Sequence, residues 1–143
     1  MTAKEFLRQY EYAVKRIRRL EEEYEAETLL IDAVRSVSDN DGMPHGSGIS
    51  KPTEERAIRL ADKRLRLVQA RLDAIEIRQE IYDTIEVVGG FEADVLFERH
   101  VNLEVDGSQQ TWDVICSKLY CSWTKARIAY NAGLDAIDKL RQE

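Results

Sequence analysis

Apolar side chains near the start of the chain recur at alternating steps of three and four residues, which places them on one face of an α-helix. Thr2 and Glu5 form a capping box at the beginning of this pattern, and Glu27 is its one polar interruption. The face consists of Phe6, Tyr10, Ala13, Ile17, Leu20, Tyr24, Ile31 and Val34. The pattern predicts a helix from Ala3 to about Arg35.

A second stripe of the same spacing follows residues 36–52, whose glycines, serines and aspartates predict a loop. The stripe consists of Ile58, Ala61, Leu65, Val68, Leu72, Ile75, Gln79 and Tyr82. Pro52 and an acidic first turn predict that this helix begins near Thr53, and Gly89-Gly90 predict that it ends near Val88.

The two predicted helices have similar lengths and complementary charges. An antiparallel match of Arg35 with Glu54 brings the acidic residues of 21–27 near the basic residues of 63–66. We therefore expect residues 1–88 to form a coiled-coil-like antiparallel helical hairpin with its loop at 36–52. Exposed ion pairs add little energy, so a merely solvated charged surface is an equal alternative.

The apolar pattern and cap residues of 91–143 predict three shorter helices. The first covers Glu92 to Val101, and Thr111 caps a second that reaches Leu119. After a turn at Tyr120-Cys121, Ser122 caps the last helix. The expected inner side of that helix consists of Ala126, Ala129, Tyr130, Leu134, Ile137 and Leu140. The fold class expected is all-α, with the long hairpin followed by a small C-terminal three-helix module of helix-turn-helix type.

The second helix of a helix-turn-helix, the recognition helix, lays its first residues in the major groove of DNA. Arg127 suits a guanine edge or a phosphate, and Lys125 suits a phosphate. Trp123 has two open roles, stacking on DNA or folding back over the turn, whereas Trp112 is expected in the core. The predicted DNA-binding residues are Thr111, Lys118, Ser122, Trp123, Thr124, Lys125, Arg127, Ile128 and Asn131.

Charge restricts this prediction to a local patch. The 143-residue chain has a net charge of −6, and from Phe91 onward it has six basic against nine acidic residues, whereas DNA-binding domains are commonly basic. One alternative is that the C-terminal helices pack on the hairpin or on a partner protein, with Lys125 and Arg127 solvated.

Other functions lack a sequence signal. Apolar runs are far shorter than the roughly 20 residues of a membrane span, and the first residues lack the pattern of a secretory signal, so a cytoplasmic location is expected. His45, His100, Cys116 and Cys121 have no metal-ligand spacing, and the cysteines are expected to be buried free thiols. We expect no enzyme activity, metal or cofactor.

Several segments resemble a known family. They are Met1-Thr2-Ala3-Lys4-Glu5-Phe6-Leu7, the Gly/Ser loop before a charged helix, and Thr111-Trp112-Asp113-Val114-Ile115 through Ser122 and Leu134. Across nearly the whole chain, the sequence resembles the RinA/ArpU-like phage and prophage transcriptional regulators of Gram-positive bacteria. It departs from them at Trp123-Thr124, where a basic residue commonly follows the cap serine, and at Ala126, where a larger apolar residue is usual.

The resemblance implies a helical N-terminal region, a C-terminal helix-turn-helix similar to region 4 of sigma factors, and control of late phage genes. The function predicted is therefore that of a phage-type transcriptional regulator that binds double-stranded DNA. The hairpin is expected to contact RNA polymerase or a second copy of the chain. A homodimer is expected because Leu60, Leu67 and Ile81 widen the apolar surface beyond what one hairpin can bury.

Two other functions stay open at this point. The first is a non-enzymatic helical adaptor or oligomerisation protein whose coiled coil is the active surface. The second is a DNA-packaging component similar to a terminase small subunit, although those proteins usually carry the helix-turn-helix near the N-terminus.

Overall fold

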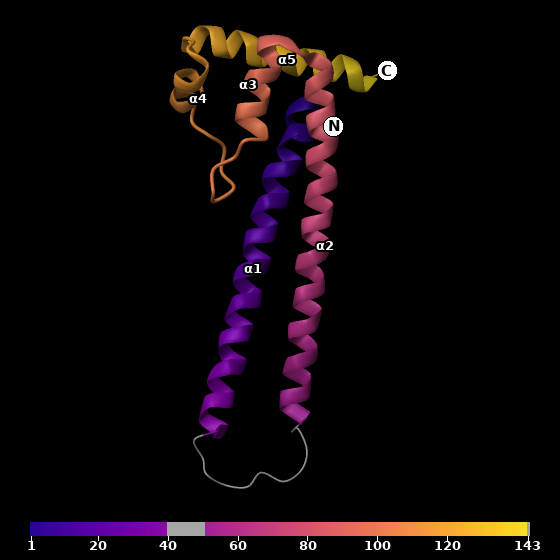
Figure 1. Ribbon diagram of the computed structural model, residues 1–143. Coiled ribbons are helices and arrows are strands. Elements are labelled where there is room, and N and C mark those ends of the chain that lie inside the picture. The colour runs from indigo at the N-terminus through magenta and orange to yellow at the C-terminus, as the bar shows by residue number, and fades with distance from the viewer. Residues whose placement is uncertain (40–50, 143) are drawn as a thin grey trace. The chain divides into compact units, whose positions relative to one another are not determined.

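The computed structural model describes residues 1–39 and 51–142, and the side chains of residues 1–33 and 54–142. The described residues form five α-helices and no strand, which confirms the all-α class. The helices are α1 (Ala3–Asp39), α2 (Lys51–Val88), α3 (Gly90–His100), α4 (Trp112–Leu119) and α5 (Trp123–Gln142) (Figure 1). None of them, within the described ranges, combines the length and apolar character needed to cross a bilayer.

Local signals place most helix ends correctly. The capping box is present, because the Thr2 amide donates to Glu5 Oε2 over 2.9 Å and the Glu5 amide donates to Thr2 Oγ1 over 3.2 Å. The end of α2 at Val88 coincides with the left-handed backbone of Gly89 (φ 64°). The predicted loop at 36–52 was too wide, since residues 36–39 and 51–52 are helical. The rest of that loop, with His45, lies outside the described residues.

The chain packs as two compact units. The middle unit is Ile17–Arg71, and the terminal unit consists of Met1–Arg16 with Leu72–Glu143. The predicted division into residues 1–88 and 91–143 follows sequence motifs instead, and it stays a prediction.

In the middle unit, segments of α1 and α2 run in opposite directions. Glu21 pairs with Arg71 over 3.0 Å, and Glu27, further along α1, pairs with Lys63, earlier in α2, over 3.5 Å. The predicted proximity of Glu27 and Lys63 is confirmed. The pair also explains the polar interruption in the α1 stripe, because the Glu27 side chain is only 16% exposed and needs a partner of opposite charge.

The predicted face of α1 is confirmed, whereas the predicted face of α2 was wrong. The residues of that face from Phe6 to Ile31 are buried or half-buried, and the Val34 side chain lies outside the part of the chain that the structure describes. The large apolar residues of the predicted α2 stripe are instead exposed: Ile58, Leu65, Val68, Leu72 and Ile75.

The side of α2 that is covered begins at Leu60 and Lys63 and continues with Leu67 and Ala70 in the middle unit and Ala74 and Ile81 in the terminal unit. Leu67 and Ala70 pack with Leu20 and Ile17 of α1. Small alanines accommodate the larger side chains of α1, so close packing, and not side-chain size in α2 alone, selects this side.

The terminal unit has the main hydrophobic core. The first turns of α1 and the last turns of α2 contribute to it together with α3 and α5, through Phe6, Leu7, Ile81, Ile85, Val95, Leu96 and Ile137. The Ala3 amide donates to Asp138 Oδ1 of α5 over 2.8 Å, which fixes the start of α1. At Gly133 of α5, a Cβ atom would lie 2.7 Å from Leu96 Cδ1, so α3 and α5 approach closely only because this residue is glycine.

Candidate nucleic-acid interface

Two capped helices separated by three residues form the C-terminal part of the terminal unit (Figure 1). Thr111 Oγ1 accepts from the Val114 amide at the start of α4, and Ser122 Oγ accepts from the Lys125 amide at the start of α5. Both predicted caps are confirmed. Between the helices, Tyr120 has a left-handed backbone (φ 52°, ψ 48°), which confirms the predicted turn.

The inner side of α5 is narrow and largely built from small residues. Ala126, Ala129, Tyr130 and Ile137 are buried as predicted, and Leu134 is half-buried. Leu140 was assigned wrongly, because it lies in the last turn of α5 and is exposed. Trp112 packs edge-on against Tyr130 with ring centroids 5.1 Å apart, which agrees with its predicted place in the core.

The opposite side of α5 is exposed over about two turns. Five of the predicted DNA-binding residues lie on it at positions i, i+1, i+4, i+5 and i+8, which share one side of a helix. We call this group the outer face of α5: Trp123, Thr124, Arg127, Ile128 and Asn131.

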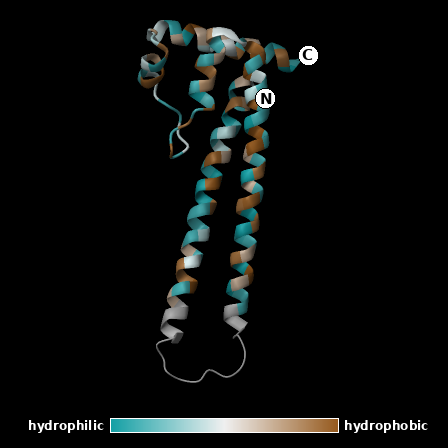
Figure 2. Cartoon of the chain, viewed as in Figure 1, coloured by the Kyte–Doolittle hydropathy of each residue, from teal (hydrophilic) through white to brown (hydrophobic). Residues whose placement is uncertain are grey.

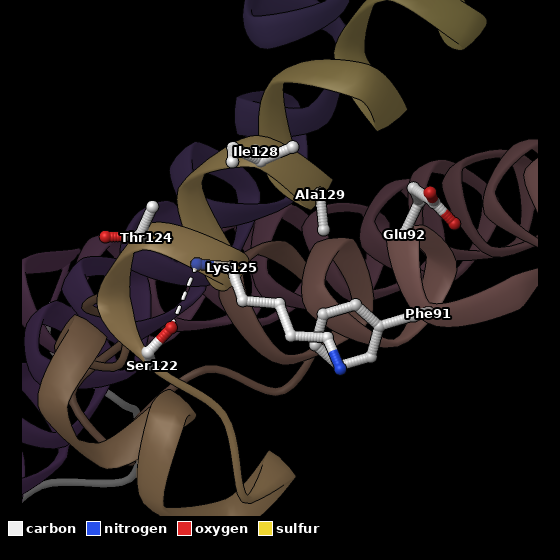
Figure 3. A pocket seen from close by; sticks show the side chains of 7 residues that line it. All are labelled: Phe91, Glu92, Ser122, Thr124, Lys125, Ile128 and Ala129. Atoms are coloured by element: carbon white, nitrogen blue, oxygen red, sulfur yellow. Dashed lines mark hydrogen bonds between the residues drawn. The ribbon is translucent and has the colours of Figure 1, made fainter.

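The two predicted lysines, Lys118 and Lys125, already have partners within the chain. Lys118 forms an ion pair with Glu98 of α3 over 3.6 Å. Lys125 Nζ lies 4.8 Å from the centre of the Phe91 ring, and Figure 3 shows the lysine side chain running along that ring. This contact borders a pocket of about 500 Å³ lined by Phe91, Glu92, Ser122, Thr124, Lys125, Ile128 and Ala129 (Figure 3).

Trp123 folds back toward α4. Its indole N–H donates to Asp113 Oδ1 over 2.7 Å, so the side chain folds back within the chain, onto the first turn of α4. The ring is still 56% exposed. With Arg127, Asn131, Trp112 and Tyr130 it lines a second pocket of about 270 Å³.

A buried polar network under α5 was missed by the sequence analysis. His100 Nε2 and the Tyr130 hydroxyl are 2.9 Å apart, and Gln109 Nε2 donates to His100 Nδ1 over 3.3 Å. Burial, with a contribution from nearby Arg99, lowers the pKa of His100 from 6.5 to about 3. The imidazole is therefore neutral and donates from Nε2 to Tyr130. The sequence spacing of His100 and Tyr130 did not indicate this contact, because the two residues are 30 positions apart.

Other chemistry lacks a site in the part of the chain that the structure describes. No group of three or more histidine, cysteine and acidic side chains could hold a metal ion there. Cys116 is buried, whereas Cys121 is only partly buried, and both are free thiols.

In comparisons with known proteins, no family model, curated protein or solved structure matches this chain. The resemblance to RinA/ArpU-like regulators therefore stays a prediction.

His100 should make folding stability depend on pH. An unfolded histidine binds a proton below about pH 6.5, whereas folded His100 stays neutral to about pH 3, so stability should fall as the pH drops through this window. The loss at pH 5 relative to pH 7.5 should be about 2 kcal/mol from this residue. Urea unfolding at both pH values measures it. His100→Gln should lose this part of the pH dependence, and an unchanged dependence in the variant would contradict the assignment.

Tyr120 should be replaceable by glycine with a gain in stability. The side chain is 95% exposed and makes little packing contact, whereas its left-handed backbone is unfavourable for any residue with a Cβ atom. Tyr120→Gly should raise the free energy of unfolding by about 0.5 to 1 kcal/mol, while Tyr120→Val should lower it. Thermal melts of both variants test this, and a destabilised glycine variant would be the contrary result.

Proposed function

We propose that this chain is a DNA-binding transcriptional regulator in which α4 and α5 act as a helix-turn-helix and α5 is the recognition helix. The observation that supports this most is the outer face of α5. It is exposed at the start of a helix whose other side is packed, which is the arrangement that a groove-reading helix needs.

The side chains of the outer face have the chemistry for reading bases. Arg127 can donate two hydrogen bonds to a guanine edge, and the Asn131 amide can pair with adenine. Thr124 and Ile128 offer methyl groups to thymine. Thr111 and Ser122 each cap one amide at a helix start, and the hydroxyls and the remaining first-turn N–H groups there are suited to phosphates.

The acidic balance of the chain shapes the expected binding. Lys118 would have to leave Glu98, and Lys125 would have to leave Phe91, before either could reach a DNA phosphate. Few side-chain cations of the helix-turn-helix are therefore available to neutralise phosphates and release counterions from the DNA. We therefore expect weak nonspecific binding, a shallow salt dependence, and affinity that depends mainly on direct base contacts.

The proposal extends to the cellular role of the protein and to the partner of its long helices. The sigma-region-4-like resemblance suggests a phage or prophage regulator in the bacterial cytoplasm, with α1 and α2 as a coiled-coil hairpin that contacts RNA polymerase or a second copy. The exposed apolar residues of α2 are equally suited to a helical adaptor, which is the competing function. A DNA-packaging role would also use DNA, but it would require a packaging partner.

Alanine substitutions on α5 test the proposal. A duplex selected from a random pool by the wild-type protein serves as the probe, and fluorescence anisotropy at two salt concentrations gives the affinity. Arg127→Ala should weaken binding by about 1 to 3 kcal/mol, or roughly 5- to 150-fold, and relax base preference at one position. Lys125→Ala should cost less, because that ammonium lies over Phe91.

Lys139→Ala provides the matched control. Lys139 is an exposed cation of the same helix, about two turns beyond the last residue of the outer face, and its loss should leave affinity nearly unchanged. Failure to select any duplex, or equal binding by wild type and Arg127→Ala, would reject the recognition helix and favour the adaptor.

A further inference from the structure

Helix α2 carries an exposed apolar stripe that nothing in the described chain covers. We call it the outer stripe of α2: Ile58, Ala61, Leu65, Val68, Leu72 and Ile75. Its five large side chains are between 44% and 68% exposed, and hydrophobic residues recur along α2 in Figure 2. The steps of three and four residues are those of coiled-coil positions a and d.

The outer stripe lies on the side of α2 away from its packed residues. Each packed residue, such as Leu60 or Leu67, stands two positions after a residue of the stripe, Ile58 or Leu65. Two positions correspond to a rotation of about 200° around the helix. Contact with α1 therefore leaves the stripe available, and α2 has a second coiled-coil seam.

The charges beside the stripe are sorted by position. With Ile58, Leu65 and Leu72 at position a, the three g positions from residue 64 to residue 78 are all arginine, and the flanking e positions are acidic or neutral. The g residues are Arg64, Arg71 and Arg78, and the e residues are Asp62, Gln69, Glu76 and Asp83.

This order specifies both a partner and its direction. In a parallel pair of identical helices, each g residue faces the e residue five positions later in the partner, so Arg71 meets Glu76 and Arg78 meets Asp83. In an antiparallel pair, g faces g and arginine would meet arginine. We propose that the outer stripe binds a second copy of this chain, through a parallel two-stranded coiled coil of α2 helices. The proposal does not depend on DNA binding by α5.

Existing contacts of the flanking residues are compatible with this pairing. Arg71 contacts Glu21 over 3.0 Å, Arg78 lies 6.0 Å from the Tyr82 ring centre, and Asp83 accepts from Gln79 over 2.8 Å. Arginine has five N–H donors and a carboxylate accepts several hydrogen bonds, so each group can add a partner. Bundles of more strands would cover the charged e and g positions, so two strands are favoured.

Light scattering after size-exclusion chromatography, over a concentration series, tests the assembly. The full chain should have the mass of a dimer. Leu65→Glu should raise the dimer dissociation constant by at least about 30-fold. Leu29→Glu is the matched control, because Leu29 is equally exposed but stands two positions from Glu27 and Ile31 of the α1 stripe, on the side of α1 away from α2. It should remain dimeric, and circular dichroism should show both variants helical.

Charge exchange tests the direction. Arg78→Glu should weaken the dimer about fivefold by facing Asp83 of the second copy, and adding Asp83→Arg should restore it. A monomeric wild type, or a Leu65→Glu variant as dimeric as wild type, would overturn the proposal. Tighter association of Arg78→Glu would overturn the parallel direction, since only an antiparallel pair would gain from that change.

Discussion

The close approach of α5 to α3 is the constraint on which the candidate interface depends. Gly133 allows it, because a side chain there would meet the buried Leu96, and the small Ala126 and Ala129 continue the same contact side. Below them, the neutral His100 donates to the Tyr130 hydroxyl, so these two polar side chains are paired within a buried environment. A helix held in this way on one side presents its other side in a defined orientation, which is what a base-reading surface requires.

Sequence reasoning succeeded where the physical cause is local. The caps at Thr2, Thr111 and Ser122 depend on side chains within three residues of the amides they accept from, so they were predictable. Sequence reasoning failed for the packed side of α2, because α2 has two apolar stripes of heptad spacing and the one with the bulkier side chains is exposed. The two stripes differ in how well they fit α1, and alanines such as Ala70 fit it best. The contact of Lys125 with Phe91 was not predictable from the sequence either, since it joins segments that are distant along the chain.

The two proposals, DNA binding and dimerisation, use the charge and apolar surface of different helices. The outer face of α5 combines hydrogen-bonding groups with methyl groups in an acidic chain, which favours specific contacts over general attraction to phosphates. The outer stripe of α2 carries no base-reading chemistry but has the sorted charges of a coiled-coil seam. A parallel dimer would supply two recognition helices, as regulators that bind two-fold symmetric operators do.

The indole N–H signal of Trp123 in nitrogen-15 NMR tests the central claim, base reading by the outer face of α5, most directly. The chain has two tryptophans, so the spectrum contains two indole signals. Trp123 lies at the start of α5 and is 56% exposed, whereas Trp112 packs against Tyr130. On titration with the selected duplex, the Trp123 signal should shift and saturate while the Trp112 signal moves much less. An unmoved Trp123 signal at saturating DNA would contradict the account.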